Sequence, residues 1–227
     1  MISIIIPALN EEDVIECCLQ SLENQNYKNF EIIVVDGGSK DRTVEIAKKY
    51  ARVLTQESKT IGGARKEGTL AARGDILAFT DADTILDPNW LSSIEKSMKK
   101  FNVTTGPVYF YENTFNASVL DFWRKSYAPQ RLVGFYRIIG SNMAIRKDTY
   151  EKIDGHSDIS LLEDYDMSEK LFKTKGVKCT YNKNQIVYTS ARRLEKLLPY
   201  LWVYLCGQYN YHVVQDHKKL KKYSLRS

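Results

Sequence analysis

Paired cysteines are absent from this sequence. Its four cysteines are Cys17, Cys18, Cys179 and Cys206, and they form neither a C-x-x-C pair nor a regular spacing. This pattern excludes a recognisable zinc cage or disulfide framework and fits a reducing compartment. The first residues also lack a basic stretch followed by a long apolar run. We therefore expect no signal peptide and a cytoplasmic location for the catalytic part.

Two common phosphate-binding motifs are also missing. No G-x-G-x-x-G follows the first apolar run, and no G-x-x-x-x-G-K-[ST] occurs anywhere. These absences remove the main sequence support for a dinucleotide-dependent oxidoreductase or a P-loop phosphotransferase. Any phosphate must be held by other means, and a divalent metal together with arginine is the simplest arrangement.

Most of the chain lacks excess charge. The formal net charge is +5, and residues 217–227 account for this surplus because they contain five cations and no acid. A neutral body argues against a nucleic-acid partner, which would require a basic face. Attraction to an anionic surface is therefore expected only at the C-terminal tail, whose cations are Lys218, Lys219, Lys221, Lys222 and Arg226.

Apolar runs alternate with helical patterns along the first half of the chain. The β-branched runs at residues 2–6 and 30–35 predict strands buried on both faces, which favours parallel pairing. Asn10 stands where it would cap the helix between them. The expected order is strand 2–6, helix 14–22, strand 30–35, helix 41–50, strand 52–55, helix 62–72, strand 76–80 and helix 90–100.

The second half of the chain has a looser pattern, without a linker, a repeat or a low-complexity segment. Its strands are therefore expected to extend the same sheet. We predict an α/β fold with a Rossmann-like, mostly parallel sheet flanked by helices. The later elements are expected at 103–111 (extended), 115–127 (helix), 138–145 (strand), 162–175 (helix), 177–181 and 185–189 (strands).

Acidic residues follow three of the predicted strands. Glu11 follows the first, Asp36 the second, and Asp81-Ala82-Asp83 the fourth. The carboxyl ends of parallel strands meet at the crevice where open α/β sheets bind ligands. Carboxylates gathered there repel one another unless a cation or many donors are present. A diphosphate carried by Mg²⁺ or Mn²⁺ would relieve that repulsion, although a lone D-x-D is more often turn chemistry.

Three arginines are candidates for holding phosphate oxygens, because a guanidinium offers a rigid fork of donors. Arg65 lies in a Gly-Gly-Ala-Arg segment, and Arg192 and Arg193 follow the last predicted strand. Each could equally be a solvated cation on a helix face. His156 follows a predicted helix end, and we expect it to be a turn residue and not a ligand.

Glu163 and Asp164 begin a predicted helix. Acids in a first turn often complement the helix dipole, and here they also suit a general base that takes a proton from a hydroxyl. No strong nucleophile stands out elsewhere, which favours one-step displacement with inversion. The segment Gly140, Ser141 and Asn142 lies on a predicted strand where small residues pack poorly, so either a ligand approaches the backbone or the strand bulges.

Taken in order, these residues resemble the family 2 glycosyltransferases, which have the GT-A fold. No single motif is decisive, but their order and spacing are specific. The similarity covers about residues 1–193. The motifs that carry it lie at residues 4–12, 34–43, 63–65, 81–83, 140–146 and 163–164.

The resemblance implies roles for particular residues. Asp164, paired with Glu163, would be the catalytic base. Asp83 and Asp81 would bind the metal and the diphosphate. Together with residues named above, the expected nucleotide-sugar-binding set is Pro7, Ala8, Asn10, Glu11, Asp36, Arg65, Asp81, Ala82, Asp83, Gly140, Ser141, Asn142, Arg192 and Arg193.

The implied activity is sugar transfer from a nucleotide diphosphate, with inversion and with Mn²⁺ or Mg²⁺ as cofactor. UDP-sugars are the donors that the family uses most often, and the acceptor would be a hydroxyl on a glycan or a lipid-linked molecule. The expected catalytic domain is 1–193, with a nucleotide-sugar-binding half at 1–110 and an acceptor-binding half at 111–193. A C-terminal amphipathic helix and basic tail would occupy 194–227.

Several departures from the family pattern bear on this expectation. Only Asp36 precedes Gly37, where the family often has two acids, and Lys66 stands where Asn often follows the arginine. The Gln-x-x-Arg-Trp motif of processive synthases is absent, which favours a single-addition enzyme. Two alternatives stay open: a polyprenyl-phosphate sugar synthase, whose phosphate acceptor hardly needs a base, and a non-catalytic membrane-binding or partner-binding protein with this fold.

The segment 197–215 contains no charged residue. Its polar residues make it poorly suited to cross a membrane, whereas its tryptophan and tyrosines suit the headgroup interface. One expectation is therefore an interfacial helix, which with the basic tail would give peripheral membrane contact at the cytoplasmic face. The other is a helix that packs its apolar stripe on the core. That stripe consists of Leu194, Leu197, Leu198, Leu201, Trp202 and Leu205.

Overall fold

The computed structural model describes residues 1–112, 114–125, 128–192, 197–214 and 220. A seven-stranded sheet lies at its centre, in the order β3-β2-β1-β4-β8-β6-β9. Strand β8 runs antiparallel to both of its neighbours, and the other pairs are parallel. The predicted α/β fold with a mostly parallel sheet is confirmed. Its strands are β1 (Ile2–Ala8), β2 (Phe30–Asp36), β3 (Arg52–Thr55), β4 (Ile76–Phe79), β6 (Val103–Thr105), β8 (Met143–Arg146) and β9 (Cys179–Tyr181).

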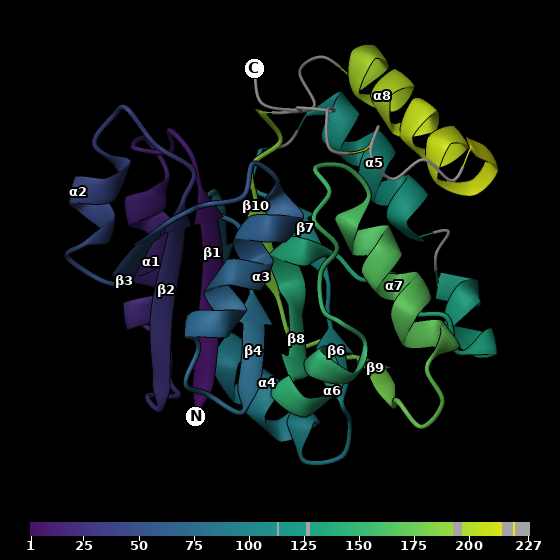
Figure 1. Cartoon of the computed structure of the whole chain (residues 1–227), viewed down its shortest axis with the longest axis horizontal. Coiled ribbons are helices and arrows are strands. Elements are labelled where there is room, and N and C mark those ends of the chain that lie inside the picture. Colours follow the sequence, from purple (N-terminus) through teal and green to yellow (C-terminus); the bar gives the residue numbers. More distant parts are fainter. Residues whose placement is uncertain (113, 126–127, 193–196, 215–219, 221–227) are drawn as a thin grey trace.

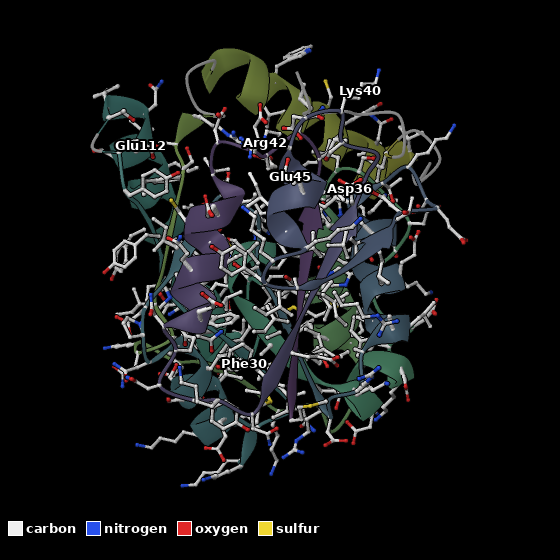
Figure 2. All side chains as sticks on the ribbon, turned by 90° about the vertical axis from the view of Figure 1, so that its left-hand side faces the viewer. Phe30, Asp36, Lys40, Arg42, Glu45 and Glu112 are labelled. Carbon is white, nitrogen blue, oxygen red and sulfur yellow. The ribbon has the colours of Figure 1, made fainter. Side chains whose placement is uncertain are left out.

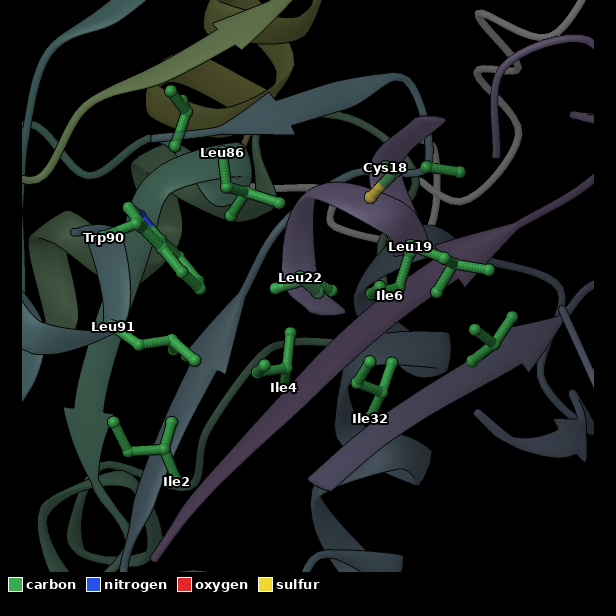
Figure 3. Packing of buried hydrophobic residues seen from close by; sticks show 14 of the residues in the cluster. Ile2, Ile4, Ile6, Cys18, Leu19, Leu22, Ile32, Leu86, Trp90 and Leu91 are labelled. Atoms are coloured by element: carbon green, nitrogen blue, oxygen red, sulfur yellow. The ribbon is translucent and has the colours of Figure 1, made fainter. Parts of the chain in front are cut away.

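Helices cover both faces of this sheet (Figure 1). Successive side chains of β1 point to opposite faces, so Ile4 and Ile6 pack in one core cluster while Ile5 packs in the other. Figure 3 shows Ile4 and Ile6 among Leu19, Leu22 and other residues of the first cluster. Burial on both faces explains why the strand is apolar throughout. The first cluster includes α1 (Ile15–Glu23) and α4 (Trp90–Met98), and the second includes α3 (Ile61–Ala71), α6 (Lys147–Lys152) and α7 (Glu163–Lys173).

Three strands form a second, small sheet in the order β5-β10-β7. They are β5 (Thr84–Leu86), β10 (Val187–Thr189) and β7 (Val108–Phe110). The expectation that all later strands extend the central sheet is therefore wrong for these three. Gly106 separates β6 from β7 and packs so close to Gln185 that a Cβ would overlap its carbonyl oxygen. The predicted extended segment 103–111 thus divides between two sheets.

Two local expectations were also wrong. Asn10 does not cap the first helix, because α1 begins at Ile15 and Asn10, with φ of 53°, instead accepts the Lys40 N–H at 2.9 Å. The segment Gly140–Asn142 is a short 3-10 turn, η2, immediately before β8. The remaining helices are α2 (Thr43–Ala47), α5 (Phe115–Lys125), η1 (Ala128–Val133), α8 (Leu197–Tyr209) and a π-helical turn, η4 (Asn210–Val214).

Candidate active site

The carboxyl ends of β2, β1 and β4 lie side by side at one edge of the sheet. These strands are neighbours and parallel, and Ala8 at the end of β1 pairs with Asp36 at the end of β2. Figure 2 shows Phe30 and Asp36 at opposite ends of β2, with Glu112 at the same end of the molecule as Asp36. The loops that carry Glu11, Asp36 and Asp81-Ala82-Asp83 therefore begin at a common edge, as expected.

Asp36 is held by its own loop. Its carboxylate accepts hydrogen bonds from the Gly38 N–H at 3.0 Å and from the Ser39 N–H at 3.1 Å and hydroxyl at 2.5 Å. The Ser39 hydroxyl oxygen in turn accepts the Asn10 N–H at 2.9 Å. The loops after β1 and β2 are thus joined. Of the smaller residues expected here, Pro7, Ala8 and Ala82 are buried, and Ala8 and Ala82 belong to the core.

Arg65 is at the centre of the site. It extends from α3, and its side chain is buried among three carboxylates. Its Nη2 lies 2.9 Å from Asp81 Oδ1, and its Nη1 lies 3.0 Å from both Glu163 Oε1 and Asp164 Oδ1. The phosphate contact expected for Arg65 stays a prediction, and here its guanidinium contacts acids of the protein. One cation instead joins an acid of the D-x-D motif to both acids of the predicted catalytic pair.

The backbone of Gly140 lies against the side chains of Arg65 and Asp164. Its N–H donates to Asp164 Oδ2 at 2.7 Å, and a Cβ at this position would overlap the Arg65 guanidinium. The Gly140 backbone thus lies against side chains of the protein, and the ligand contact expected for it stays a prediction. Ser141, the next residue, is also buried.

Asn142, expected to contact the nucleotide sugar, has several partners within the protein, and its ligand contact stays a prediction. The side chain is fully buried, and its Oδ1 accepts hydrogen bonds from Trp90 Nε1 at 2.8 Å and Gln185 Nε2 at 2.9 Å. Its Nδ2 donates to the carbonyl oxygens of Pro107 at 2.9 Å and Gln185 at 2.7 Å. With these four hydrogen bonds, the Asn142 side chain joins α4 to the loops around the small sheet.

Burial changes the acidity of the predicted catalytic pair. It raises the pKa of Glu163 to about 7, and the negative charge of Asp164 adds to the rise while Arg65 opposes it. Burial also raises the pKa of Asp164, against the lowering effects of Arg65 and the Gly140 N–H. A single guanidinium cannot neutralise three carboxylates, so one proton retained by the pair relieves the repulsion.

A second arginine, Arg192, contacts two further acids of the site. Arg192 Nη2 forms an ion pair with Glu11 Oε2 and lies 3.9 Å from Asp83 Oδ2. The Thr189 hydroxyl, in β10, donates to Asp83 Oδ1 at 3.3 Å. Arg192 therefore lies between the two acids that were expected to contact ribose and metal. Arg193 is outside the described residues.

Sequence reasoning missed two residues that support this arrangement. One is Thr189. The other is Glu112, whose carboxylate accepts the Ser190 hydroxyl at 2.7 Å and the Ala191 N–H at 2.6 Å, immediately before Arg192. Glu112 follows the predicted extended segment, and no motif marks it, so only its position in the fold reveals its role.

His156 follows α6 in a turn, as expected, but it is buried. Its Nδ1 lies 3.0 Å from the Tyr150 hydroxyl oxygen, and its ring contacts Phe79 edge-on at 4.8 Å between centroids. Burial lowers the pKa of His156, and the charges of Arg65 and Lys170 lower it further. The imidazole is therefore neutral at physiological pH.

Asp81 and Asp83, the acids of the D-x-D motif, suit a metal ion that binds together with the phosphates of a substrate. Within the described part of the chain, no three His, Cys, Asp or Glu side chains form a ready metal cluster. Mg²⁺ and similar hard cations are commonly bound by one or two carboxylates together with substrate phosphates and water. Asp83 and Asp81 can supply carboxylate oxygens of that kind, so they suit a metal–diphosphate complex better than a free ion.

Comparisons with known proteins agree with this chemistry. The sequence profile of glycosyl transferase family 2 matches residues 3–154. Glycosyltransferase GlyA of Streptococcus pneumoniae is 27% identical over 156 residues, which cover 66% of this chain and 22% of GlyA. The UDP-Glc:alpha-D-GlcNAc-diphosphoundecaprenol beta-1,3-glucosyltransferase WfgD of Escherichia coli is 29% identical over 158 residues, 67% of this chain and 54% of WfgD.

Solved structures share the fold at low sequence identity. The mannosyltransferase PcManGT of Pyrobaculum calidifontis, solved with GDP-Man and Mn²⁺, superposes with a TM-score of 0.66 at 18% identity. The superposition covers 86% of this chain and 60% of PcManGT. All three matches thus span less than two thirds of the other protein.

Proposed function

This chain belongs to glycosyl transferase family 2, and we propose that it transfers one sugar at a time, with inversion, from a nucleotide diphosphate to a hydroxyl acceptor. The observation that carries the proposal is the group around Arg65. Its two terminal nitrogens join Asp81, expected on the donor side, to Glu163 and Asp164, expected on the acceptor side. Such a contact fixes the distance between leaving group and base, which a one-step displacement requires.

In the proposed donor site, Glu11 and Asp36 bind the nucleoside, and Asp83 and Asp81 hold the metal–diphosphate. A bound Mn²⁺ or Mg²⁺ would stabilise the negative charge that develops on the departing diphosphate. Arg192 would leave Glu11 when the donor binds and contact the phosphate oxygens, since a guanidinium can grip phosphate in the same bidentate way. A UDP-sugar is the first donor to test, because WfgD uses UDP-Glc.

In the proposed acceptor site, Asp164 is the general base. The acceptor oxygen attacks the anomeric carbon from the side opposite the diphosphate, its proton passes to Asp164, and the bond between that carbon and the diphosphate oxygen breaks. Arg65 and the Gly140 N–H hold one oxygen each of the Asp164 carboxylate. Glu163 keeps a proton more readily than an ordinary glutamate, which leaves Asp164 to act as the ionised member of the pair.

The acceptor in this proposal is lipid-linked, by analogy with the diphosphoundecaprenol-linked acceptor named for WfgD. A lipid-linked acceptor would bring the chain to the cytoplasmic face of a membrane, with residues 194–227 as the peripheral contact. In the domain division that we propose, residues 1–110 bind the donor and 111–193 the acceptor.

The test is a screen of UDP- and GDP-sugars for thermal stabilisation with Mn²⁺, followed by turnover of the stabilising donor. A ligand that binds only the folded state raises its stability by mass action. Stabilisation by one nucleotide sugar, together with its metal-dependent hydrolysis or transfer, supports the proposal. No stabilisation by any donor would favour a non-catalytic protein with this fold.

A further inference from the structure

The C-terminal helix exposes an apolar face. Trp202, Leu205, Tyr209 and Val213 are 69%, 61%, 58% and 64% exposed. They recur at intervals of three and four residues, so they lie along one side of α8 and of the turn η4 that continues it. We call these four residues the outer face of α8. Large apolar side chains in a continuous exposed row are unusual on a soluble surface and mark an interaction site.

The opposite side of the same segment is docked on the protein. Gly207 lies so close to Leu161 that a Cβ would overlap the leucine side chain. The Tyr211 hydroxyl bonds Asp166 Oδ1 at 2.9 Å, and its ring meets Tyr165 edge-on at 5.4 Å between centroids. Core packing therefore explains the inner side. It does not explain the outer face, which includes Trp202 and Leu205 of the stripe predicted to pack on the core.

The chemistry of this segment favours one kind of partner. Residues 197–215 carry no charge, and residues 217–227 carry five cations and no acid. Trp202 and Tyr209 each combine an apolar ring with a polar tip, the property that concentrates these residues at the headgroup level of bilayers. Cations that follow directly in the sequence are attracted to anionic leaflets. A protein partner would not require both features together.

We propose that the outer face of α8 binds the surface of an anionic lipid bilayer, with the cations of 217–227 as its electrostatic component. None of the helices in the described residues is long and apolar enough to cross a membrane, so the contact is with the surface. On the docked side, the Tyr211 hydroxyl donates a hydrogen bond to Asp166, which lies two positions after Asp164 in the sequence. The bilayer would thus lie next to the helix that carries the proposed base. This inference specifies the side chains and the lipid charge behind the peripheral contact proposed above, and it does not depend on the proposed reaction.

Flotation with vesicles tests the proposal. The full chain should float with phosphatidylcholine vesicles that contain phosphatidylglycerol, should not float with pure phosphatidylcholine, and should detach at high salt. The variant Trp202→Gln/Leu205→Gln/Tyr209→Gln should lose at least tenfold in bound fraction at limiting lipid. These side chains are exposed, so the thermal transition should stay unchanged.

The matched control is Leu70→Gln, because Leu70 is an apolar residue 80% exposed on α3, outside the proposed surface. It should float like the unmodified chain. A second variant, Lys218→Gln/Lys219→Gln/Lys221→Gln/Lys222→Gln, should float less without any change to α8. Failure of the full chain to float, or equal flotation of the triple variant, would overturn the proposal. Concentration-dependent dimers that the triple variant abolishes, without vesicle binding, would also overturn it and assign the face to a second copy.

Discussion

Nη1 of Arg65 lies 3.0 Å from Oδ1 of Asp164, although 99 positions separate the two residues in the sequence. The other terminal nitrogen of Arg65 bonds Asp81, which belongs to the D-x-D motif. Any movement of the α7 start relative to the end of β4 must therefore break a buried ion pair.

Asp164→Asn should lower kcat by two or more orders of magnitude and leave donor affinity nearly unchanged. A positioned general base contributes roughly that much to a rate, and the amide keeps the size of the side chain. Turnover measured beside calorimetric donor binding checks this. A loss of donor affinity at an unchanged rate would assign Asp164 to the binding site. Full activity of the variant would favour a phosphate acceptor.

Arg65→Lys should destabilise the fold by about 3–5 kcal/mol near neutral pH, the usual effect of leaving buried charges unpaired. One ammonium cannot contact three carboxylates in the geometry of the guanidinium fork. Arg65 lowers the pKa of Glu163 and Asp164, so its contribution is present while these two acids are ionised and is lost as they become protonated at lower pH. Denaturant unfolding at several pH values should therefore show a difference that shrinks on acidification.

Lys66→Gln serves as the control for that variant. Lys66 is the next residue, but its ion pair with Asp154 is exposed on both sides, and such pairs contribute little. Its effect on the free energy of unfolding should be small at every pH. Equal destabilisation by both variants would mean that the Arg65 group has no special stabilising role.

The rate should fall on acidification through a pKa well above the ordinary carboxylate range. The base must be unprotonated, and burial raises the pKa of Asp164 and raises that of Glu163 to about 7. Activity is thus expected at pH values above the pKa of Asp164 and should be lost at pH values below it. Glu163→Gln removes the other titrating member of the pair, so a kcat–pH profile of this variant should keep the inflection that belongs to Asp164. An inflection near 4 in the unmodified enzyme, the value of an ordinary carboxylate, would contradict this account.

UDP or GDP binding should require Mn²⁺ or Mg²⁺, and Asp83→Ala should abolish that requirement together with most of the affinity. Asp83 follows β4 at the edge where the acidic residues gather, so a cation should relieve the repulsion among their charges. Calorimetry with and without EDTA measures the effect. Asp75→Asn, which changes an exposed acid, should behave like the unmodified chain. Affinity that is equal in both conditions would exclude a metal role.

Glu112→Ala should raise the KM for the donor more than it lowers kcat. Glu112 touches no substrate in our proposal. Its carboxylate accepts hydrogen bonds from the Ser190 hydroxyl and the Ala191 N–H, the two residues that precede Arg192. Glu112→Gln keeps one acceptor oxygen and should recover part of the affinity. In a double-mutant cycle with Arg192→Ala, the second substitution should add little. Additive effects would mean that Glu112 acts independently of Arg192.

The gathering of acidic residues at one edge of the sheet could be predicted from the sequence. Long β-branched runs identify a parallel sheet, and a parallel sheet brings the carboxyl ends of its strands together. The Arg65 group could not be predicted. It depends on contacts between residues nearly a hundred positions apart, and a buried arginine and a solvated one have the same local sequence. The partners of Asn142 could not be predicted for a similar reason: nothing in the local sequence indicates that its four hydrogen bonds come from α4 and from loops around the small sheet. The small sheet was missed because strands of three residues carry almost no periodicity.

The pairing of β6 with β8 has a consequence for how this chain can diversify. Thr105 pairs with Met143, so the segment between them leaves the central sheet and returns to the next strand. The sheet is closed at that point whatever the excursion contains, and surface insertions between fixed ends are well tolerated thermodynamically. The two ends of this excursion are fixed, because β7 pairs with β10 and Gly140 lies against Arg65, so sequence change is best tolerated in its middle, at α5 and η1. Grafting the α5–η1 stretch from a relative would therefore test whether this part selects the proposed acceptor, without rebuilding the sheet.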